Sequence, residues 1–334
     1  MIDKYITLAH GNGGRYMREL IDDLFARHLT PCQLDSHHDA ALLPGLQGQC
    51  LMTTDGYTVQ PLEFPGGDIG SLAVHGTVND LAVCGALPRY LSLNAFLEEG
   101  LAIEQLDRIM VSLSRAAQQC RVAIVTGDTK VLPRGLVSGI YLATTGIGIR
   151  NAAFEQGFDR IRAGDAVIVS GPVGDHGAAV MLAREQYGLR GDVVSDSASI
   201  WPLCQTACEL PGLRFMRDPT RGGLVTVACD IVTQTGLGLR LREKDIPVRE
   251  AVRGVGELLG FDPLYLACEG RVMAVVAADQ AGELLRRWCT LPEGRESAVI
   301  GTFIESPVQV VLETRLGGER VLEELEDDPL PRIC

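Results

Sequence analysis

The stretch TTDGYTVQPLEFPGGDIGSLAVHGTVNDLAVCGA, residues 53–86, joins the end of a strand to a helix through a loop rich in proline and glycine. The apolar run at 50–55 predicts the strand, and residues 68–86 predict the helix. Proline and glycine at 60–67 interrupt both patterns, because these residues disfavour the interior of regular elements. A strand followed directly by a helix indicates a domain built from both kinds of element.

Helices and strands continue to mix on both sides of this stretch. Amphipathic patterns predict helices over 16–29 and 102–120, and apolar runs predict strands over 89–97, 122–128 and 136–149. The second half opens with AVIVSGPVGDHGAAVML, which predicts a strand, a glycine-rich turn and a helix. Because strands and helices do not alternate strictly, we predict an α+β fold with mixed sheets covered by helices.

The chain length of 334 residues favours two domains over one very large domain. A boundary is expected near 150–165, where charges and glycines separate two apolar strands. After residue 314 two glycines permit a hinge, an acidic run follows, and two prolines stiffen the approach to Cys334. The predicted segments are a glycine-rich segment with a helix (1–38), a first domain (39–155), a second α+β domain (156–314) and a mobile C-terminal arm (315–334).

The bulk composition excludes several classes of protein. A net charge of −13 and a pI of about 5.0 argue against a broad nucleic-acid-binding face. No run approaches 18 uncharged apolar residues, and the first residues lack the features of a signal peptide, so we expect a cytoplasmic protein without a membrane span. The ten cysteines are then expected to be thiols, and the absence of a CxxC pair gives a zinc site little support.

Four aspartates of the first half fall at strand ends or glycine-bounded turns: Asp39, Asp55, Asp80 and Asp128. Magnesium beside a polyphosphate prefers hard oxygen ligands, and carboxylates in such positions supply them. Each one alone is more often a helix cap or an Asx-turn than a metal ligand. Four together, with Asn79 next to Asp80, predict a metal–nucleotide site as readily as a set of structural turns.

Lys130 is one of only three lysines in the chain, and it follows Asp128 in the motif GDTKV. A compact ammonium group at the end of an apolar strand can neutralise phosphate oxygens. The alternative is an ordinary solvated lysine on a turn. The chain has no Gly-Lys pair and therefore no Walker A motif, so a nucleotide site of the P-loop type is excluded.

The second half offers three further candidates. His176 lies in the glycine-rich turn GPVGDHG, and Glu269 in ACEGR is a candidate base if it faces a cleft, or otherwise an ordinary strand-end charge. RDPTRGGL (217–224) joins a turn to a helix, where exposed N–H groups can bind an anion or Thr220 can cap the helix.

With these motifs collected, the chain resembles the HypE family of hydrogenase maturation proteins, in the PurM-like superfamily of ATP-dependent enzymes related to aminoimidazole ribonucleotide synthetase. HGNGG, the stretch 53–86, GDTKV, GPVGDHG, RDPTRGGL and the terminal PRIC occur in the family's order. The resemblance implies a two-domain PurM-like fold, a homodimer whose first domains pair their strands, and ATP with Mg²⁺ in segment 39–155.

The same resemblance assigns site residues by motif position. Asp39, Asp55, Asp80 and Asp128 match the metal ligands. The nucleotide site implied by the family comprises these four together with Asn79, Gly127, Thr129 and Lys130. One departure stands before Asp39, where the superfamily has an acidic pair and this chain has His38.

The family's reaction explains a cysteine at the chain end. A partner carbamoyltransferase of the HypF type places a carbamoyl group on the residue matching Cys334, and ATP drives its dehydration to a thiocyanate. A HypC–HypD-type scaffold then accepts the cyanide for the iron of a [NiFe]-hydrogenase. The chemistry requires an activated amide oxygen and proton transfer, for which Lys130, Glu269 and His176 are candidates, with Glu269 the preferred base.

Two alternatives remain from the sequence. The first is a small-molecule kinase or synthetase of the same superfamily, such as a thiamine-phosphate kinase, which needs no terminal thiol. The second is a non-catalytic carrier of the carbamoyl or cyano group, which would tolerate replacement of its aspartates.

Overall fold

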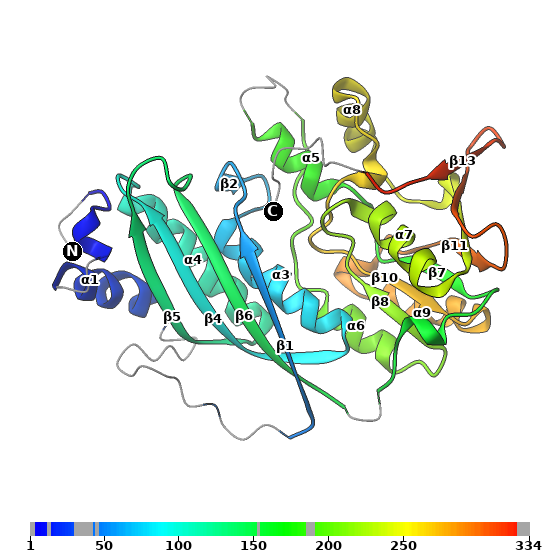
Figure 1. The fold of residues 1–334 in the computed structure, drawn as a ribbon, viewed down its shortest axis with the longest axis horizontal. Helices are drawn as coiled ribbons and strands as arrows, with labels where there is room; N and C mark the ends of the chain where they lie inside the picture. Colours follow the sequence, from blue (N-terminus) through cyan, green and yellow to red (C-terminus); the bar gives the residue numbers. More distant parts are fainter. Residues whose placement is uncertain are drawn as a thin grey trace. The chain divides into compact units, whose positions relative to one another are not determined.

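The computed structural model describes residues 4–11, 15–29, 43, 47–151, 154–184 and 191–325. These residues form two compact units (Figure 1), which are treated separately below. The first unit contains the described residues up to Leu81 and Ala86–Asn151, and the second contains Ala82–Gly85 and the described residues after Asn151. The domain boundaries predicted from the sequence remain predictions. No helix within the described ranges is long and apolar enough to cross a membrane.

The described residues of the first unit form a four-stranded sheet. Its strands, in spatial order, are β1 (Gln49–Tyr57), β6 (Ile140–Arg150), β4 (Ala86–Glu98) and β5 (Ala123–Leu132). Neighbouring strands are antiparallel except β4 and β5, which are parallel and are connected through α4 (Ile103–Cys120). A parallel pair needs such a crossover because the chain must return to the same end of the sheet.

Helices α3 (Ile69–Val83) and α4 cover one face of this sheet (Figure 1). α3 follows a short hairpin of β2 (Glu63–Phe64) and β3 (Gly67–Asp68). It begins where the Asp68 carboxylate accepts the backbone N–H groups of Gly70 and Ser71, at 2.8 and 2.9 Å, which caps its N-terminus. The predicted helix at 68–86 and the strands around it are therefore confirmed.

A buried polar contact fixes α3 against the sheet. The Tyr57 hydroxyl on β1 lies 3.1 Å from the Thr77 hydroxyl on α3, which also bonds the Thr144 hydroxyl on β6. A Cβ atom on Gly76 would overlap the Tyr57 hydroxyl, so only glycine permits this approach of the helix to β1. These contacts show that Tyr57 on β1 and Thr144 on β6 lie on the face of the sheet that α3 covers.

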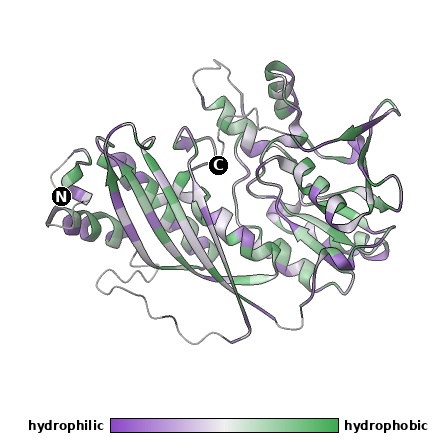
Figure 2. Cartoon of the chain, in the orientation of Figure 1, coloured by the Kyte–Doolittle hydropathy of each residue, from purple (hydrophilic) through white to green (hydrophobic). Residues whose placement is uncertain are grey.

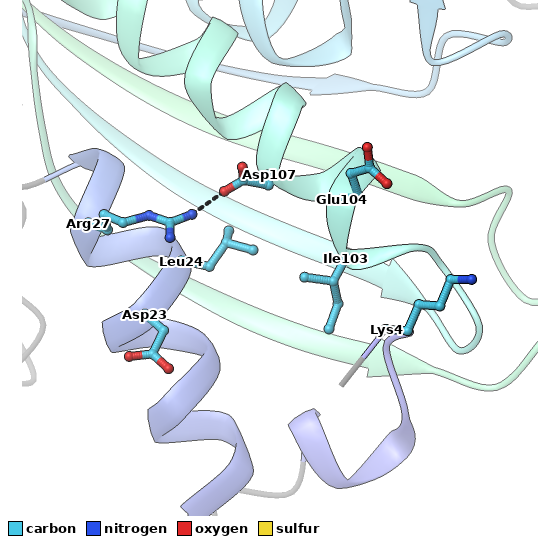
Figure 3. A pocket seen from close by; sticks show the side chains of 7 residues that line it. All are labelled: Lys4, Asp23, Leu24, Arg27, Ile103, Glu104 and Asp107. Carbon is cyan, nitrogen blue, oxygen red and sulfur yellow. Dashed lines mark hydrogen bonds and ion pairs between the residues drawn. The ribbon is translucent and has the colours of Figure 1, made fainter. Parts of the chain in front are cut away.

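The N-terminal residues add a helical layer against α4. The predicted helix at 16–29 is present as α1 (Arg15–Leu20), a π-helical turn η2 (Ile21–Ala26) and α2 (Arg27–Leu29). A pocket of about 320 Å³ separates this layer from α4 (Figure 3). Arg27 and Asp107 point towards each other across it and form an ion pair. None of the residues lining this pocket is a candidate from the sequence.

The second unit contains a mixed seven-stranded sheet. Its strands, in spatial order, are β13 (Glu319–Leu322), β12 (Val310–Glu313), β9 (Gly238–Arg242), β11 (Ala298–Ile304), β7 (Ala166–Val169), β10 (Met273–Val276) and β8 (Leu213–Arg217). The longer helices of this unit are α5 (Asp175–Leu182), α6 (Trp201–Cys208), α7 (Gly223–Thr235), α8 (Glu250–Leu259) and α9 (Ala281–Trp288).

Apolar cores lie on both faces of this sheet. β7 and β10 are hydrophobic throughout (Figure 2). Val167 and Val169 pack with residues of α7, whereas Ala166 and Ile168 pack with residues of α6 and α9. Because alternate residues of a strand face opposite sides, a strand buried on both faces must be apolar at every position. The α+β fold of mixed sheets covered by helices is thereby confirmed.

The chain after residue 314 differs from the prediction of an arm that begins at 315. Gly317 has a φ of +83° and lies in a tight turn, and the Thr314 N–H donates to the Gly318 carbonyl at 2.8 Å. The two glycines therefore make the hairpin between β12 and β13, not a hinge. β13 forms backbone hydrogen bonds with β12 along its whole length, so this part of the predicted arm belongs to the sheet. Cys334 lies outside the described residues.

Candidate active site

In the first unit, β1 and α3 bring Asp55 and Asp80 to one region. The Thr53 hydroxyl donates to the Asp80 carboxylate at 2.8 Å. Thr53 and Asp55 are two residues apart on β1 and therefore point to the same face of the sheet. Asp55 is exposed, and its carboxylate accepts the Gly56 N–H at 2.7 Å. Asn79, which the sequence places in the nucleotide site, is buried on α3.

The GDTK motif lies within strand β5. The Lys130 ammonium group is 2.9 Å from the Asp128 carboxylate, and both side chains are about half exposed. The Asp128 carboxylate also accepts the Thr129 N–H at 2.8 Å, while Thr129 itself is buried. Lys130 is thus held by an ion pair on a strand, whereas the sequence left open a solvated lysine on a turn. Gly127 precedes this pair on the same strand.

The strand register separates these two groups of residues. Thr144 lies opposite both Asp55 on β1 and Leu93 on β4, and Leu93 lies opposite Gly127 on β5. Directly opposed residues share a face, so Asp55 and Gly127 are both on the face that α3 covers. Asp128 is the next residue and points to the other face. Because β1 and β5 are also opposite edges of the sheet formed by the described residues, these residues of one chain do not bring Asp55 and Asp128 together.

The described residues of one chain offer some of the carboxylates that a magnesium site would need. Asp55 and Asp80 fit the pattern in which Mg²⁺ binds through one or two carboxylates together with phosphate oxygens and water. Within the described ranges, no three His, Cys, Asp or Glu side chains converge to hold a metal ion by themselves. Asp39, the fourth predicted ligand, lies outside these ranges, as does His38.

In the second unit, three chain segments converge in what we call the polar cluster. It consists of Asp175 and His176 at the start of α5, Ser195 and Asp196 in the segment before α6, and Glu269 and Arg271 before β10. All six side chains are buried or nearly so. The cluster contains His176 and Glu269, two of the three candidates from this half of the sequence.

Hydrogen bonds tie these segments together. The His176 Nδ1 atom is 2.8 Å from the Ser195 hydroxyl, and the Glu269 N–H donates to the Asp196 carboxylate at 3.0 Å. Arg271 lies between two carboxylates, with its Nε atom 3.3 Å from Asp196 and its Nη2 atom 3.5 Å from Asp175. The same guanidinium donates to the Pro172 carbonyl at 2.9 Å, which holds the glycine-rich turn against the Glu269 segment.

The charges of the polar cluster are incompletely balanced. Burial raises the pKa of Asp175, against the lowering effect of its hydrogen bond from Arg249 at 3.0 Å. Burial also raises the pKa of Asp196, and Arg271 opposes that shift. One carboxylate oxygen of Asp175 has no hydrogen-bond partner among the described residues. Buried carboxylates held by arginines in this way are frequent at functional sites.

Asp175, Ser195, Asp196 and Arg271 were not predicted as site residues from the sequence. Asp175 and Arg271 lie inside the motifs GPVGDHG and ACEGR, close to the predicted candidates His176 and Glu269. Ser195 and Asp196 follow a loop without a recognisable pattern, so only the three-dimensional contacts identify them. At RDPTRGGL the structure also differs from one expectation: Gly222, not Thr220, is the N-cap of α7.

Comparison with known proteins identifies the family. Residues 37–150 match the AIR synthase related protein N-terminal domain, and residues 162–313 match the C-terminal domain of the same family. The carbamoyl dehydratase HypE of Azotobacter vinelandii is 44% identical to this chain over 331 residues, which cover 98% of this chain and 97% of the relative. The chain belongs to the HypE family.

Solved structures of the HypE family agree with this assignment. A crystal structure of the hydrogenase maturation protein HypE in complex with ATP has a TM-score of 0.93 and 44% identity, and the match covers 98% of this chain and 99% of that one. A crystal structure of a HypE–HypF complex has a TM-score of 0.80 and 38% identity, with 93% of this chain and 100% of that chain covered. The resemblance and the PurM-like fold inferred from the sequence motifs are therefore confirmed.

Proposed function

We propose that this protein is an ATP-dependent carbamoyl dehydratase that makes the cyanide ligands of the [NiFe]-hydrogenase iron. The observation that carries the proposal is identity of 44% over almost the whole chain with the carbamoyl dehydratase HypE of Azotobacter vinelandii. The chain ends in Cys334, which supplies the thiol that the reaction needs. The reaction converts an S-carbamoyl cysteine and ATP into an S-cyano cysteine, ADP and phosphate.

The residues of the first unit are proposed to bind Mg-ATP. Asp55 and Asp80, with Asp39 and Asp128, would hold Mg²⁺, which neutralises charge on the phosphate oxygens. Lys130 is half exposed beside Asp128 and would place its ammonium group on the phosphates. Asn79, Gly127 and Thr129 belong to the same elements, α3 and β5, and complete the proposed nucleotide site.

The chemical step has two requirements. Phosphorylation of the carbamoyl oxygen turns it into a leaving group, and two protons must leave the nitrogen as the C≡N bond forms. Glu269 is the proposed base, and its burial together with His176 in the polar cluster suits proton transfer shielded from water. Cys334 is the carrier, and Lys130 assists at the phosphates.

We also propose that the active protein is a homodimer. The register places Asp55 and Asp128 on opposite faces and opposite edges of one sheet, so a second copy is needed to bring such residues together. Both β1 and β5 are edge strands of the described sheet, and long edge strands pair readily with another chain. On the face that no described helix covers, Met52 is 73% exposed.

The proposed partners follow from the reaction. A HypF-type carbamoyltransferase would load Cys334, and the structure of a relative in a HypE–HypF complex supports this pairing. A HypC–HypD-type scaffold would accept the cyanide. We place the reaction in the cytoplasm, where thiols stay reduced, and no cysteine in the described ranges forms a disulfide.

The decisive experiment measures the mass of the C-terminal peptide after incubation with the carbamoyltransferase and its carbamoyl donor, before and after Mg-ATP is added. We expect a carbamoyl adduct on Cys334 that becomes a cyano adduct only with ATP. Cys334→Ala should take up no carbamoyl group and keep the melting temperature of the parent. An unmodified Cys334 beside an active transferase would refute the proposal in favour of a kinase-type reaction, and a carbamoyl adduct that never changes would leave only a carrier.

A further inference from the structure

The segment of residues 195–197 contacts both candidate proton-transfer residues of the second unit. Ser195 places its hydroxyl 2.8 Å from His176 Nδ1, and Asp196 accepts the backbone N–H of Glu269 at 3.0 Å. The Ser197 N–H in turn donates to the Ser195 hydroxyl at 3.1 Å, which fixes that side chain. This segment forms no helix or strand, so its conformation is held by these side-chain contacts.

Asp196 is the most constrained member of the segment. Its side chain is only 1% exposed. One carboxylate oxygen accepts the Glu269 N–H, and the other forms an ion pair with the Arg271 guanidinium at 3.3 Å but has no hydrogen-bond partner among the described residues. The Gly270 N–H also lowers its pKa by hydrogen bonding, against the rise that burial causes. A Cβ atom on Gly270 would overlap the Asp196 carbonyl oxygen, so the two backbones are in direct contact. A buried carboxylate in such a position holds the turn that carries Glu269.

We propose that Asp196 is a positioning residue that sets the Glu269 side chain for proton transfer. The inference rests on the proposed function, in which Glu269 is the base. Asp196 binds the backbone on which Glu269 is carried, and Arg271 holds Asp196 from the other side. Arg271 is itself anchored by the Pro172 and Glu293 carbonyls, so the turn is fixed at both ends. Asp196 does not touch the substrate in this proposal.

Asp196→Asn tests the proposal with little change in volume. The amide oxygen can still accept the Glu269 N–H, but the neutral amide removes the negative charge that pairs with Arg271. We expect the single-turnover rate of cyano formation on carbamoyl-loaded Cys334 to fall by about tenfold to a hundredfold, because small displacements of catalytic groups have effects of that order. The Mg-ATP concentration that gives the half-maximal rate should stay within about twofold of the parent value.

A double-mutant cycle separates positioning from general structural damage. If Asp196 acts through Glu269, the rate of Glu269→Gln with Asp196→Asn should equal that of Glu269→Gln alone. The matched control is Asp165→Asn, because Asp165 is also buried, accepts the Arg162 N–H at 2.8 Å and pairs with Arg214 at 3.3 Å. Asp165→Asn should change the melting temperature about as much as Asp196→Asn does. Its rate of cyano formation should equal that of the parent.

The outcomes are distinct. Additive slowing in the double variant, or an Asp196→Asn rate equal to the parent, would overturn the positioning role and leave the proposed function intact. A Glu269→Gln rate equal to the parent would remove the base and the positioning role together. A parent chain that forms no cyano group would mean that the proposed function itself fails. If Asp196→Asn does not fold, Arg271→Lys weakens the same pair from the other side and enters the same cycle.

Discussion

His75 lies on α3 with its side chain buried, and burial lowers the pKa of its imidazole from 6.5 to about 4. A buried imidazole stays neutral because the charged form loses its hydration. In the unfolded chain the same group takes up a proton near pH 6.5. Between these two values the unfolded state binds more protons than the folded state, so the free energy of unfolding rises with pH across this window.

We therefore predict an acid-sensitive first unit. Lowering the pH from 6.5 to about 4 should reduce the free energy of unfolding by about 3 kcal/mol through His75 alone. In His75→Gln this contribution disappears, so the variant should lose less stability than the parent over the same range, whatever its stability at neutral pH. Urea titrations at a series of pH values measure the difference, and parallel pH profiles would contradict the assignment.

At the scale of elements, the contact of α3 with β1 depends on Gly76. A methyl group at this position would overlap the Tyr57 hydroxyl, which is buried and bonded to Thr77. Gly76→Ala should lower the free energy of unfolding by about 1–3 kcal/mol, because overpacking outweighs the better helix propensity of alanine. Gly254→Ala on α8 has no atom within 4 Å of the added carbon and should raise it by about 0.5–1 kcal/mol. Opposite shifts in denaturation midpoint are the expected result, and equal shifts would contradict it.

Elements with a strong local pattern were predictable, and those defined by a distant partner were not. α4 has an apolar stripe over 18 residues, and β4 an alternating burial pattern, so each was found from its own period. β13 has four residues, and within the described part of the chain it pairs with β12 alone. Its sequence, ERVL after two glycines, fits a hinge and an acidic arm as well as a hairpin. The backbone hydrogen bonds between β12 and β13 decide in favour of the hairpin.

At the scale of the whole molecule, the sequence suggests candidate residue types for the proposed site more readily than their grouping in space. Asp55 and Asp80 were expected together, and Thr53 links β1 to α3 at that place. Asp128 was expected in the same site, but the face on which a strand residue lies depends on sheet order and register, which local sequence does not determine. Ser195 and Asp196 could not be predicted for a similar reason, because their partners His176 and Glu269 are distant in the sequence.

The separation of Asp80 from Lys130 leads to a test of the homodimer. Asp80→Asn and Lys130→Ala should each abolish tight Mg-ATP binding. A mixture of the two variants that exchanges chains should regain about a quarter of the binding sites. Half of the randomly paired dimers then contain one chain of each variant, and each of these mixed dimers keeps one of its two sites intact. Asp55→Asn mixed with Asp80→Asn is the matched control, since these residues lie on the same side of one chain and no intact site can form. Calorimetric titration with Mg-ATP counts the sites, and native mass spectrometry verifies exchange. Exchange without regained sites would mean that a single chain forms the whole nucleotide site, against the strand register.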